Sequence, residues 1–439
     1  MKYYLVSLGC AKNSVDSESI ARLLNRDGWT ATQTPQQADL MLVNTCGFIK
    51  PARDESYEYL AELAELKTEN QVLVAAGCLS ERVQQAILTE VPGVDGIIGS
   101  KRWMDIIPFV NQVRQNYKLS PIYYPSGESF GDEPDILRAS ILGNSAYLKI
   151  ADGCRRKCAY CSIPLIKGST VSRPMESVLS DAKKLEQIGM KEIILIAQDI
   201  TDYALDLGVK NGLESLLKYM VKEIPAIPWI RLLYLFPGQI SDQLIELMAQ
   251  NQQILHYIDI PLQHAHPDIL KKMNRPSDIE WITRTFEKLR SAMPDVAIRT
   301  TFITGFPGET EKEFDFLLDF VKTMRFDRVG VFPYWFEKGT PSEKLGDPIL
   351  MDVKQKRLEA LMKTQGKISL SINKKFVGKT LQVLTEGTQE GMIVGRSYRD
   401  APEIDGLVFI NGDVPLNELV SVKITTAMMH DLIGVPAII

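Results

Sequence analysis

The chain has 439 residues, a net charge of −5, and 45% apolar against 24% charged residues. This length predicts two to four domains, and the composition is that of a globular protein rather than a disordered or polyanion-binding one. No apolar run is long enough to span a membrane, so we expect a cytoplasmic protein without a membrane partner.

The first third of the chain alternates apolar strands with amphipathic helices. Strands are predicted at 3–8, 38–45, 71–76 and 95–100, and a helix over 14–28 is expected to be capped by Asn13 or Ser14. This pattern predicts an α/β domain over 1–117, with a parallel sheet covered on both faces. The next segment, 118–145, is rich in Pro, Gly and Ser, which predicts a linker.

The middle of the chain, 146–350, repeats a strand–helix unit six times. The predicted strands are 146–151, 192–198, 229–236, 256–262, 297–304 and 328–335. Six such units predict a (β/α)6-like partial TIM barrel, a fold whose chemistry lies on loops at the C-terminal ends of the strands. A connecting helix over 351–375 then leads to four short β runs within 376–439, which predict a small antiparallel β-barrel.

The six cysteines fall into two sets of three. Cys10, Cys46 and Cys78 each follow a predicted strand and have a neighbouring glycine. Parallel strands end at one edge of their sheet, so these three thiols are expected to converge on a shared metal or redox site rather than to form disulfides. The alternative is that each is an ordinary small buried residue.

The second set, Cys154, Cys158 and Cys161, forms a CxxxCxxC motif after the first barrel strand, with Tyr160 before its last cysteine. Three thiolates can hold three irons of an iron–sulfur cube and leave the fourth iron open to a substrate. Structural zinc is the alternative, but zinc needs a fourth ligand, and no Cys or His occurs between 162 and 255.

This motif and its place in the chain resemble the radical S-adenosylmethionine superfamily. The segments SLGCAKNSVDSE, NTCGFI, AGCLSER and GCRRKCAYCSIPLIKGSTVSRP, with the terminal β-barrel, resemble its methylthiotransferases over the whole chain. The resemblance implies two [4Fe-4S] clusters, one on each cysteine triplet, S-adenosyl-L-methionine as cosubstrate, and a C-terminal TRAM domain. It also implies a 5′-deoxyadenosyl radical that abstracts hydrogen, and an electron donor such as a flavodoxin or ferredoxin.

Residues at the ends of the barrel strands are further candidates for binding S-adenosylmethionine. By the resemblance, Tyr160 would lie against the adenine. The polar candidates are Gln198, Gln263, Arg299 and Thr301, and Gly305 would let the adenosine approach closely. The alternative for each is a structural role in its loop. We assign no catalytic residue beyond the cluster ligands.

The resemblance leaves two types of methylthiotransferase to choose between, and they differ in their substrate. The motifs SLGC-x-KN, NTCGFI, DIPLQHA, TTFITGFPGET and GRSYRDAPEIDGLVF resemble the RimO type, which modifies an aspartate β-carbon in small-subunit ribosomal protein twelve. Residues 376–439 carry four basic and eight acidic side chains, which suits a basic protein better than RNA, so a nucleic-acid partner is less expected. The alternatives are a tRNA adenosine methylthiotransferase (MiaB type) and a non-catalytic metal or iron–sulfur binding module.

Overall fold

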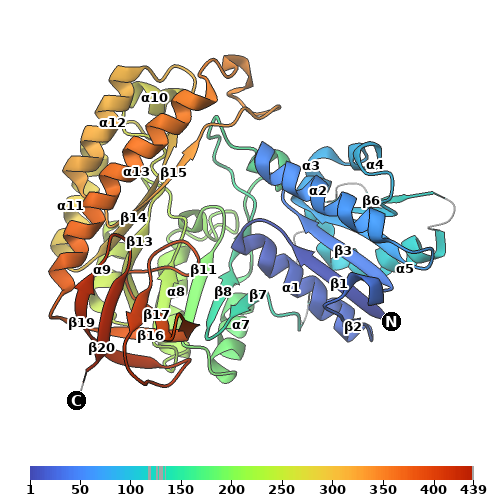
Figure 1. Ribbon diagram of the computed structural model, residues 1–439, viewed down its shortest axis with the longest axis horizontal. Helices are drawn as coiled ribbons and strands as arrows, with labels where there is room; N and C mark the ends of the chain where they lie inside the picture. Colours follow the sequence, from blue (N-terminus) through green and yellow to red (C-terminus); the bar gives the residue numbers. More distant parts are fainter. Residues whose placement is uncertain (117–119, 125–126, 128–131, 134, 438–439) are drawn as a thin grey trace.

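A computed structural model describes residues 1–116, 120–124, 127, 132–133 and 135–437 of the chain. Figure 1 shows an N-terminal α/β domain on the right, a larger central domain of sheet and helices, and a small barrel at the lower left. The fold class predicted from the sequence is confirmed. Within the described residues, no helix is long and apolar enough to cross a membrane.

The N-terminal domain is built on a parallel sheet with the order β2-β1-β3-β4-β5-β6. Its strands are β1 (Lys2–Ser7), β2 (Thr30–Ala31), β3 (Leu40–Thr45), β4 (Val72–Gly77), β5 (Gly96–Gly99) and β6 (Ile122–Tyr124). The two faces are covered by α1 (Ala11–Arg26) with α5 (Ile106–Asn116), and by α2 (Lys50–Leu66) with α3 (Cys78–Val83) and α4 (Ala86–Glu90). The doubly covered parallel sheet is therefore confirmed, and all four predicted strands are present.

Two local predictions differ from the structure. The predicted linker, 118–145, contributes β6 to the N-terminal sheet and β7 (Ala139–Leu142) to the central sheet, and part of it lies outside the described residues. Helix α1 begins at Ala11 after Cys10, so neither Asn13 nor Ser14 is its cap. The Asn13 side chain instead donates to the carbonyls of Leu8 and Thr45, which ties the start of α1 to the sheet. The domain boundaries stay predictions.

The central domain has a seven-stranded sheet in the order β15-β14-β13-β12-β11-β8-β7, in which only the β7–β8 pair is antiparallel. The six predicted parallel strands are β8 (Ser145–Lys149), β11 (Glu192–Ile196), β12 (Trp229–Leu232), β13 (Ile254–Asp259), β14 (Ala297–Thr304) and β15 (Arg328–Pro333). The helices between them are α6 (Ile163–Ile166), α7 (Met175–Gln187), α8 (Gly212–Glu223), α9 (Asp242–Gln250), α10 (Pro267–Lys272), α11 (Ile279–Ala292) and α12 (Glu311–Met324). A short antiparallel pair, β9 (Ala151–Asp152) with β10 (Val171–Ser172), flanks the cysteine loop.

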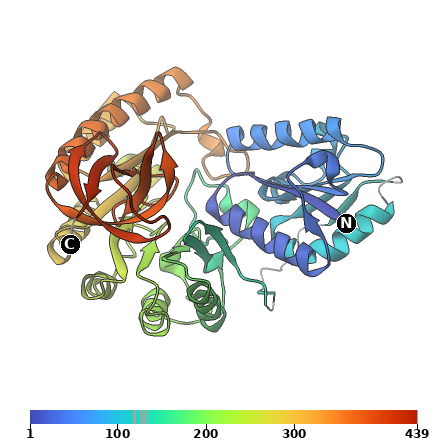
Figure 2. The same ribbon diagram turned by 60° about the horizontal axis from the view of Figure 1, so that its bottom comes forward.

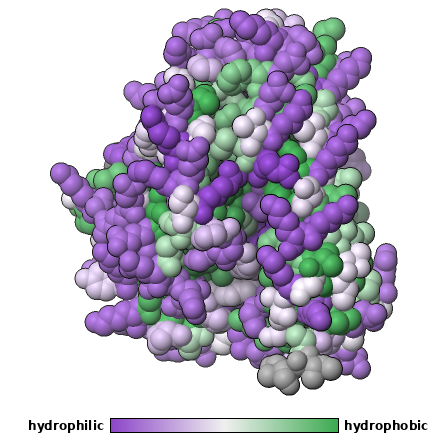
Figure 3. Space-filling view, turned by 90° about the vertical axis from the view of Figure 1, so that its left-hand side faces the viewer, coloured by the Kyte–Doolittle hydropathy of each residue, from purple (hydrophilic) through white to green (hydrophobic). Residues whose placement is uncertain are grey.

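This sheet is an open partial barrel, since its edge strands β15 and β7 do not pair with each other. Its helices lie on the outside (Figure 2) and share one large apolar core with the outward faces of the strands. Figure 3 shows that the surface on the side of α11–α13 is mostly hydrophilic, as expected for helices whose opposite face packs on the sheet.

The chain ends in a closed five-stranded barrel that follows the long helix α13 (Met351–Asn373). Its strands are β16 (Thr380–Gln389), β17 (Met392–Ser397), β18 (Val408–Ile410), β19 (Leu419–Ala427) and β20 (Leu432–Pro436). The sequence predicted four of them and missed β20, which closes the barrel. All strand pairs are antiparallel except β18–β20.

The end of β17 and the loop after it lie against the N-terminal ends of the central strands. Three buried ion pairs join the two units: Arg396 with Glu192, Arg399 with Asp327, and Arg328 with Asp400. Burial alone would raise the pKa of Glu192, but the charges of Arg396 and Arg231 outweigh it and lower the pKa to about 2. The C-terminal barrel is thus docked through charged groups that are removed from water.

Asp16 of α1 lies at the centre of a second buried group of charges, between the N-terminal and central domains. Its carboxylate accepts hydrogen bonds from Arg138 at 2.8 Å, Lys149 at 2.7 Å and Lys167 at 3.1 Å. Asp152 lies 2.7–3.5 Å from the same three cations. None of the five side chains is more than 9% exposed, so this contact fixes how the two domains sit against each other.

Candidate functional site

The first cysteine triplet lies at the C-terminal edge of the N-terminal sheet. Cys10 precedes α1, Cys46 follows β3, and Cys78 is the first residue of α3, directly after β4. Gly9 has φ +97°, and a Cβ built on it would lie 2.9 Å from Cys46 Cβ and 3.0 Å from its sulfur. The loop that carries Cys10 therefore touches Cys46, and only glycine permits this approach.

Cys78 is joined to the same cluster through Asn13, whose side-chain oxygen lies 3.5 Å from the Cys78 sulfur. Burial raises the pKa of Cys78 to about 12; Lys167 works against this rise, and the nearby thiols of Cys10 and Cys46 add to it. The structure thus brings the three thiols together, as the strand-end pattern predicts. A positively charged metal group supplies what three crowded thiolates need in order to ionise.

The second triplet lies on the loop after β9, at the C-terminal side of the central strands. Its backbone is held on several sides: Cys154 N–H donates to Gly168 at 3.0 Å, and Ala159 N–H donates to Met273 at 2.8 Å. Burial raises the pKa of Cys154 to about 11 and that of Cys161 to about 12, so these thiols too ionise readily only beside added positive charge.

Arg275 is a site residue that the sequence did not reveal. Its guanidinium lies 3.6 Å from the Cys158 sulfur and stacks on Phe236, with 4.3 Å between Arg275 Cζ and the ring centroid. Arg156 stacks on the same ring at 4.2 Å. A cation donating to a ligand sulfur stabilises the thiolate. Arg156 lies inside the CxxxCxxC motif, but Arg275 belongs to no recognisable motif and lies 117 positions from the cysteine that it contacts.

The two triplets meet at the junction of the N-terminal and central domains. The hydroxyl of Ser162, which follows Cys161, donates to the carbonyl of Phe48, two residues after Cys46, at 2.7 Å. The loop after β15 covers both, since Ser342 N–H donates to the Ala159 carbonyl at 2.9 Å. The geometry therefore places the two cysteine loops next to each other rather than at opposite ends of the molecule.

Glu337, in the loop after β15, clamps this junction. Its carboxylate is 1% exposed, pairs with Arg53 and with Arg82 at 2.8 Å, and accepts the Lys50 N–H at 2.8 Å. We expect Glu337→Gln to lower the free energy of unfolding by about 1–3 kcal/mol, because two half-buried cations lose their counter-charge.

Urea denaturation measures this loss. Glu343→Gln, in the same loop but exposed and bonded only to Gly339 N–H, is the matched control and should change stability by less than about 0.5 kcal/mol. Equal losses in the two variants would contradict a clamp at Glu337.

The residues predicted to bind S-adenosylmethionine fall into two groups: some can still contact a ligand, and the others already have partners within the protein. Tyr160 is partly buried against Ile303 and Phe306 at the end of β14. The side-chain oxygen of Gln198, just after β11, is buried and has no hydrogen-bond partner among the described residues, so it can accept a donor from a ligand. Gln263 lies in the same region with φ +76°, and its backbone pairs with β14.

Arg299, Thr301 and Gly305 already have partners within the protein. Arg299 donates to Asp259 at 2.9 Å, lies 3.4 Å from Asp405 of the C-terminal barrel, and is 3.4 Å from the Thr301 hydroxyl. Gly305 has φ +73°, and a Cβ there would lie 2.2 Å from the Lys354 side chain. These contacts support a structural role for Arg299, Thr301 and Gly305. For all the candidate residues, contact with S-adenosylmethionine stays a prediction.

Each of the two sites offers three free thiols as its donor set. Within the described residues, no group of three or more His, Cys, Asp and Glu side chains is arranged to hold one metal ion. A structural zinc needs four ligands at about 2.0–2.3 Å from one point. Three thiols per site is the number of protein ligands that an iron–sulfur cube with one open iron takes, and such a cube on each triplet stays a prediction.

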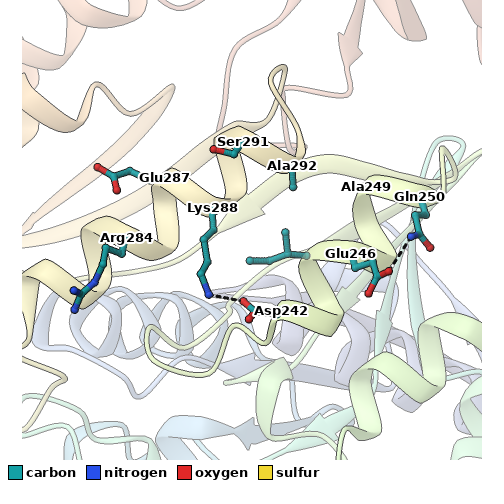
Figure 4. A pocket seen from close by; sticks show the side chains of 10 residues that line it. Asp242, Glu246, Ala249, Gln250, Arg284, Glu287, Lys288, Ser291 and Ala292 are labelled. Carbon is teal, nitrogen blue, oxygen red and sulfur yellow. Dashed lines mark hydrogen bonds and ion pairs between the residues drawn. The ribbon is translucent and has the colours of Figure 1, made fainter.

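A groove of about 800 Å³ lies between α9 and α11 (Figure 4). Its walls are surface side chains, among them the Lys288–Asp242 pair at 2.8 Å, and it contains no cysteine. We assign no role in the chemistry to this groove.

Three family models match successive segments of the chain, and these segments correspond to the three structural units of the fold. Residues 2–99 match the uncharacterized protein family UPF0004, residues 148–321 match the radical SAM superfamily, and residues 377–436 match the TRAM domain.

Among solved structures, the radical S-adenosylmethionine methyltransferase TsrM from Kitasatospora setae matches 89% of this chain and 79% of its own, with a TM-score of 0.56 and 14% identity. The cobalamin-dependent radical enzyme OxsB matches 82% of this chain and 56% of its own, with a TM-score of 0.51 and 12% identity. At these identities the likeness supports the fold alone.

Sequence relatives are much closer. A ribosomal protein uS12 methylthiotransferase RimO from Herpetosiphon aurantiacus is 42% identical over 99% of both chains, and one from Chloroflexus aurantiacus is 43% identical over 99% of both. A third, from Carboxydothermus hydrogenoformans, is 42% identical over 99% of both. With this match over its whole length, and with both cysteine triplets in place, the chain belongs to the radical S-adenosylmethionine methylthiotransferase family.

Proposed function

We propose that this enzyme inserts a methylthio group at the β-carbon of an aspartate in small-subunit ribosomal protein twelve, uS12. The observation that carries the proposal is the full-length similarity, at 42–43% identity, to relatives named as uS12 methylthiotransferases. Family membership makes the chain an enzyme, so a non-catalytic metal-binding module is not retained as an alternative.

Cys154, Cys158 and Cys161 would hold one [4Fe-4S] cluster, and Cys10, Cys46 and Cys78 a second. The first would supply the electron that cleaves S-adenosylmethionine, and the second the sulfur to be inserted. The protein's part is to orient the reactants and exclude water. The hydrogen bond between Ser162 and Phe48 and the ion pairs of Glu337 support this arrangement, because they hold the two cysteine loops next to each other.

The surface charge of the C-terminal barrel supports a basic protein as substrate. Two of its four basic side chains, Arg396 and Arg399, are 1% exposed and engaged in ion pairs with the central domain. The exposed acidic residues are Glu390, Glu403, Asp413 and Glu418, against exposed Lys379 and Lys423. An RNA-binding barrel would need the reverse balance. Because ribosomal proteins are assembled in the cytoplasm, we propose that the enzyme acts there, with a flavodoxin- or ferredoxin-like electron donor.

The test is an anaerobic assay of reconstituted enzyme with reductant, sulfide and S-adenosylmethionine. Ribosomal protein uS12 and unmodified tRNA are offered in separate reactions, and the products are read by mass spectrometry. We expect a methylthio mass gain on the protein and none on the tRNA. A gain on tRNA alone would overturn the substrate assignment.

A further inference from the structure

Lys12 reaches from the N-terminal domain to the C-terminal edge of the central strands. It lies in the first turn of α1, two residues after Cys10. Its ammonium nitrogen is 3.3 Å from the centroid of the Tyr234 ring, just beyond the end of β12. Tyr234 N–H in turn donates to Asp259, the last residue of β13, at 3.0 Å. A single lysine therefore stands between one cysteine triplet and the mouth of the partial barrel.

Lys12 differs from the other cations at this domain junction. Five of these pair with buried carboxylates: Arg138, Lys149 and Lys167 with Asp16, and Arg53 and Arg82 with Glu337. Within the part of the chain that the structure describes, Lys12 forms no ion pair, although it is partly buried. Tyr234, Cys10 and Asp259 all stabilise its positive charge, and Asp259 already accepts from Arg299 and from Tyr234 N–H.

The closest printed contact of the Lys12 ammonium is the Tyr234 ring, and no carboxylate of the described residues forms an ion pair with it. An aromatic ring satisfies one side of the cation, and a lysine has three N–H donors. Removal from water is costly for a cation unless an anion replaces the lost hydration. The Tyr234 ring engages one side of the ammonium, so Lys12 can still donate to an anionic group of a ligand.

We propose that Lys12 binds the side-chain carboxylate of the substrate aspartate and thereby holds its β-carbon between the two cysteine triplets. This rests on the proposed function. In an aspartate the carboxyl carbon is bonded directly to the β-carbon, so a cation that fixes the carboxylate fixes the reacting carbon about 1.5 Å away. An adenine base carries no carboxylate, so it would lack this contact.

A double-substitution cycle on binding tests the contact without turnover. Reconstituted enzyme with S-adenosylmethionine, but without reductant, is titrated with uS12 and with uS12 whose modified aspartate is changed to Asn. We expect Lys12→Met to weaken binding of the aspartate form by about 10- to 100-fold and to leave binding of the Asn form within about twofold. Lys12→Arg, which keeps the charge, should lose less than Lys12→Met.

Lys363→Met, on the exposed face of α13, changes net charge equally and controls for long-range attraction between enzyme and substrate. With reductant added, Lys12→Met should still cleave S-adenosylmethionine to 5′-deoxyadenosine. Equal weakening for both substrate forms, or no weakening, overturns the contact. Loss of cleavage would place Lys12 at the cosubstrate instead. If wild-type enzyme modifies tRNA and not uS12, the proposed function itself fails.

Discussion

Replacing Cys154, Cys158 or Cys161 with alanine is expected to reduce cleavage of S-adenosylmethionine to background, the largest loss of activity that we predict for any substitution. With two thiolates left, the cube lacks protein ligation at two irons, and no other Cys or His occurs between 162 and 255 to replace the missing one. The measurement is 5′-deoxyadenosine formed by reconstituted, reduced enzyme, with iron content determined in parallel. Iron should fall by about half, since the other triplet remains.

Alanine substitutions in the first cysteine triplet provide the control for those in the second. Alanine at Cys10, Cys46 or Cys78 should also halve the iron, but should spare cleavage to 5′-deoxyadenosine and abolish insertion of sulfur. Cys78 is the most informative of the three, because its sulfur touches Asn13 and its burial raises its pKa to about 12. Loss of cleavage in Cys78→Ala protein that retains wild-type stability would mean that the two triplets do not divide the reaction as we propose.

The second large effect concerns stability. Asp16→Asn is expected to lower the free energy of unfolding by about 3–5 kcal/mol, because three buried cations then lose the carboxylate that they share. Urea denaturation measures the change. The control is Asp54→Asn, which breaks the exposed Lys50–Asp54 pair on α2 and should cost less than about 1 kcal/mol. Similar losses for both variants would contradict a central role for Asp16.

The stabilisation that Asp16 provides should be lost as the pH falls. Burial alone would raise the pKa of Asp16, but the charges of Lys149, Lys167 and Arg138 outweigh it and hold the pKa far below its ordinary value. A carboxylate with a depressed folded-state pKa contributes fully above its unfolded pKa of about 3.9 and loses that contribution as the pH falls toward the folded value. The difference between wild type and Asp16→Asn should therefore be constant near neutral pH and shrink below about pH 4.

The sequence could predict those parts of the site whose residues directly follow a recognisable strand. Apolar runs located β1, β3 and β4, and parallel pairing then places Cys10, Cys46 and Cys78 at one edge. The CxxxCxxC loop is local in sequence, so its role could be read without a fold. In the C-terminal barrel, β20 was missed because LIGVP is short and has no clear alternation.

The rest depends on contacts between residues far apart in the chain. Arg275 lies 117 positions from the cysteine that it contacts, and Asp16 lies 122 positions from Arg138. Asn is a residue type that often caps helices, yet the Asn13 side chain donates instead to the carbonyls of Leu8 and Thr45. The hydrophobic periodicity of a helix or strand indicates which of its faces is buried, but it does not indicate which other element packs against that face.

The docking of the C-terminal barrel has a consequence for domain exchange. Such barrels look like portable modules, but this one supplies Arg396 and Arg399 to Glu192 and Asp327 of the central sheet. A barrel transplanted from another protein without these arginines would leave Asp327 without its ion-pair partner and Glu192 with Arg231 alone. Altering the enzyme's choice of partner by exchanging this barrel therefore requires that the arginines be transferred with it, and that only its outer, exposed loops be varied.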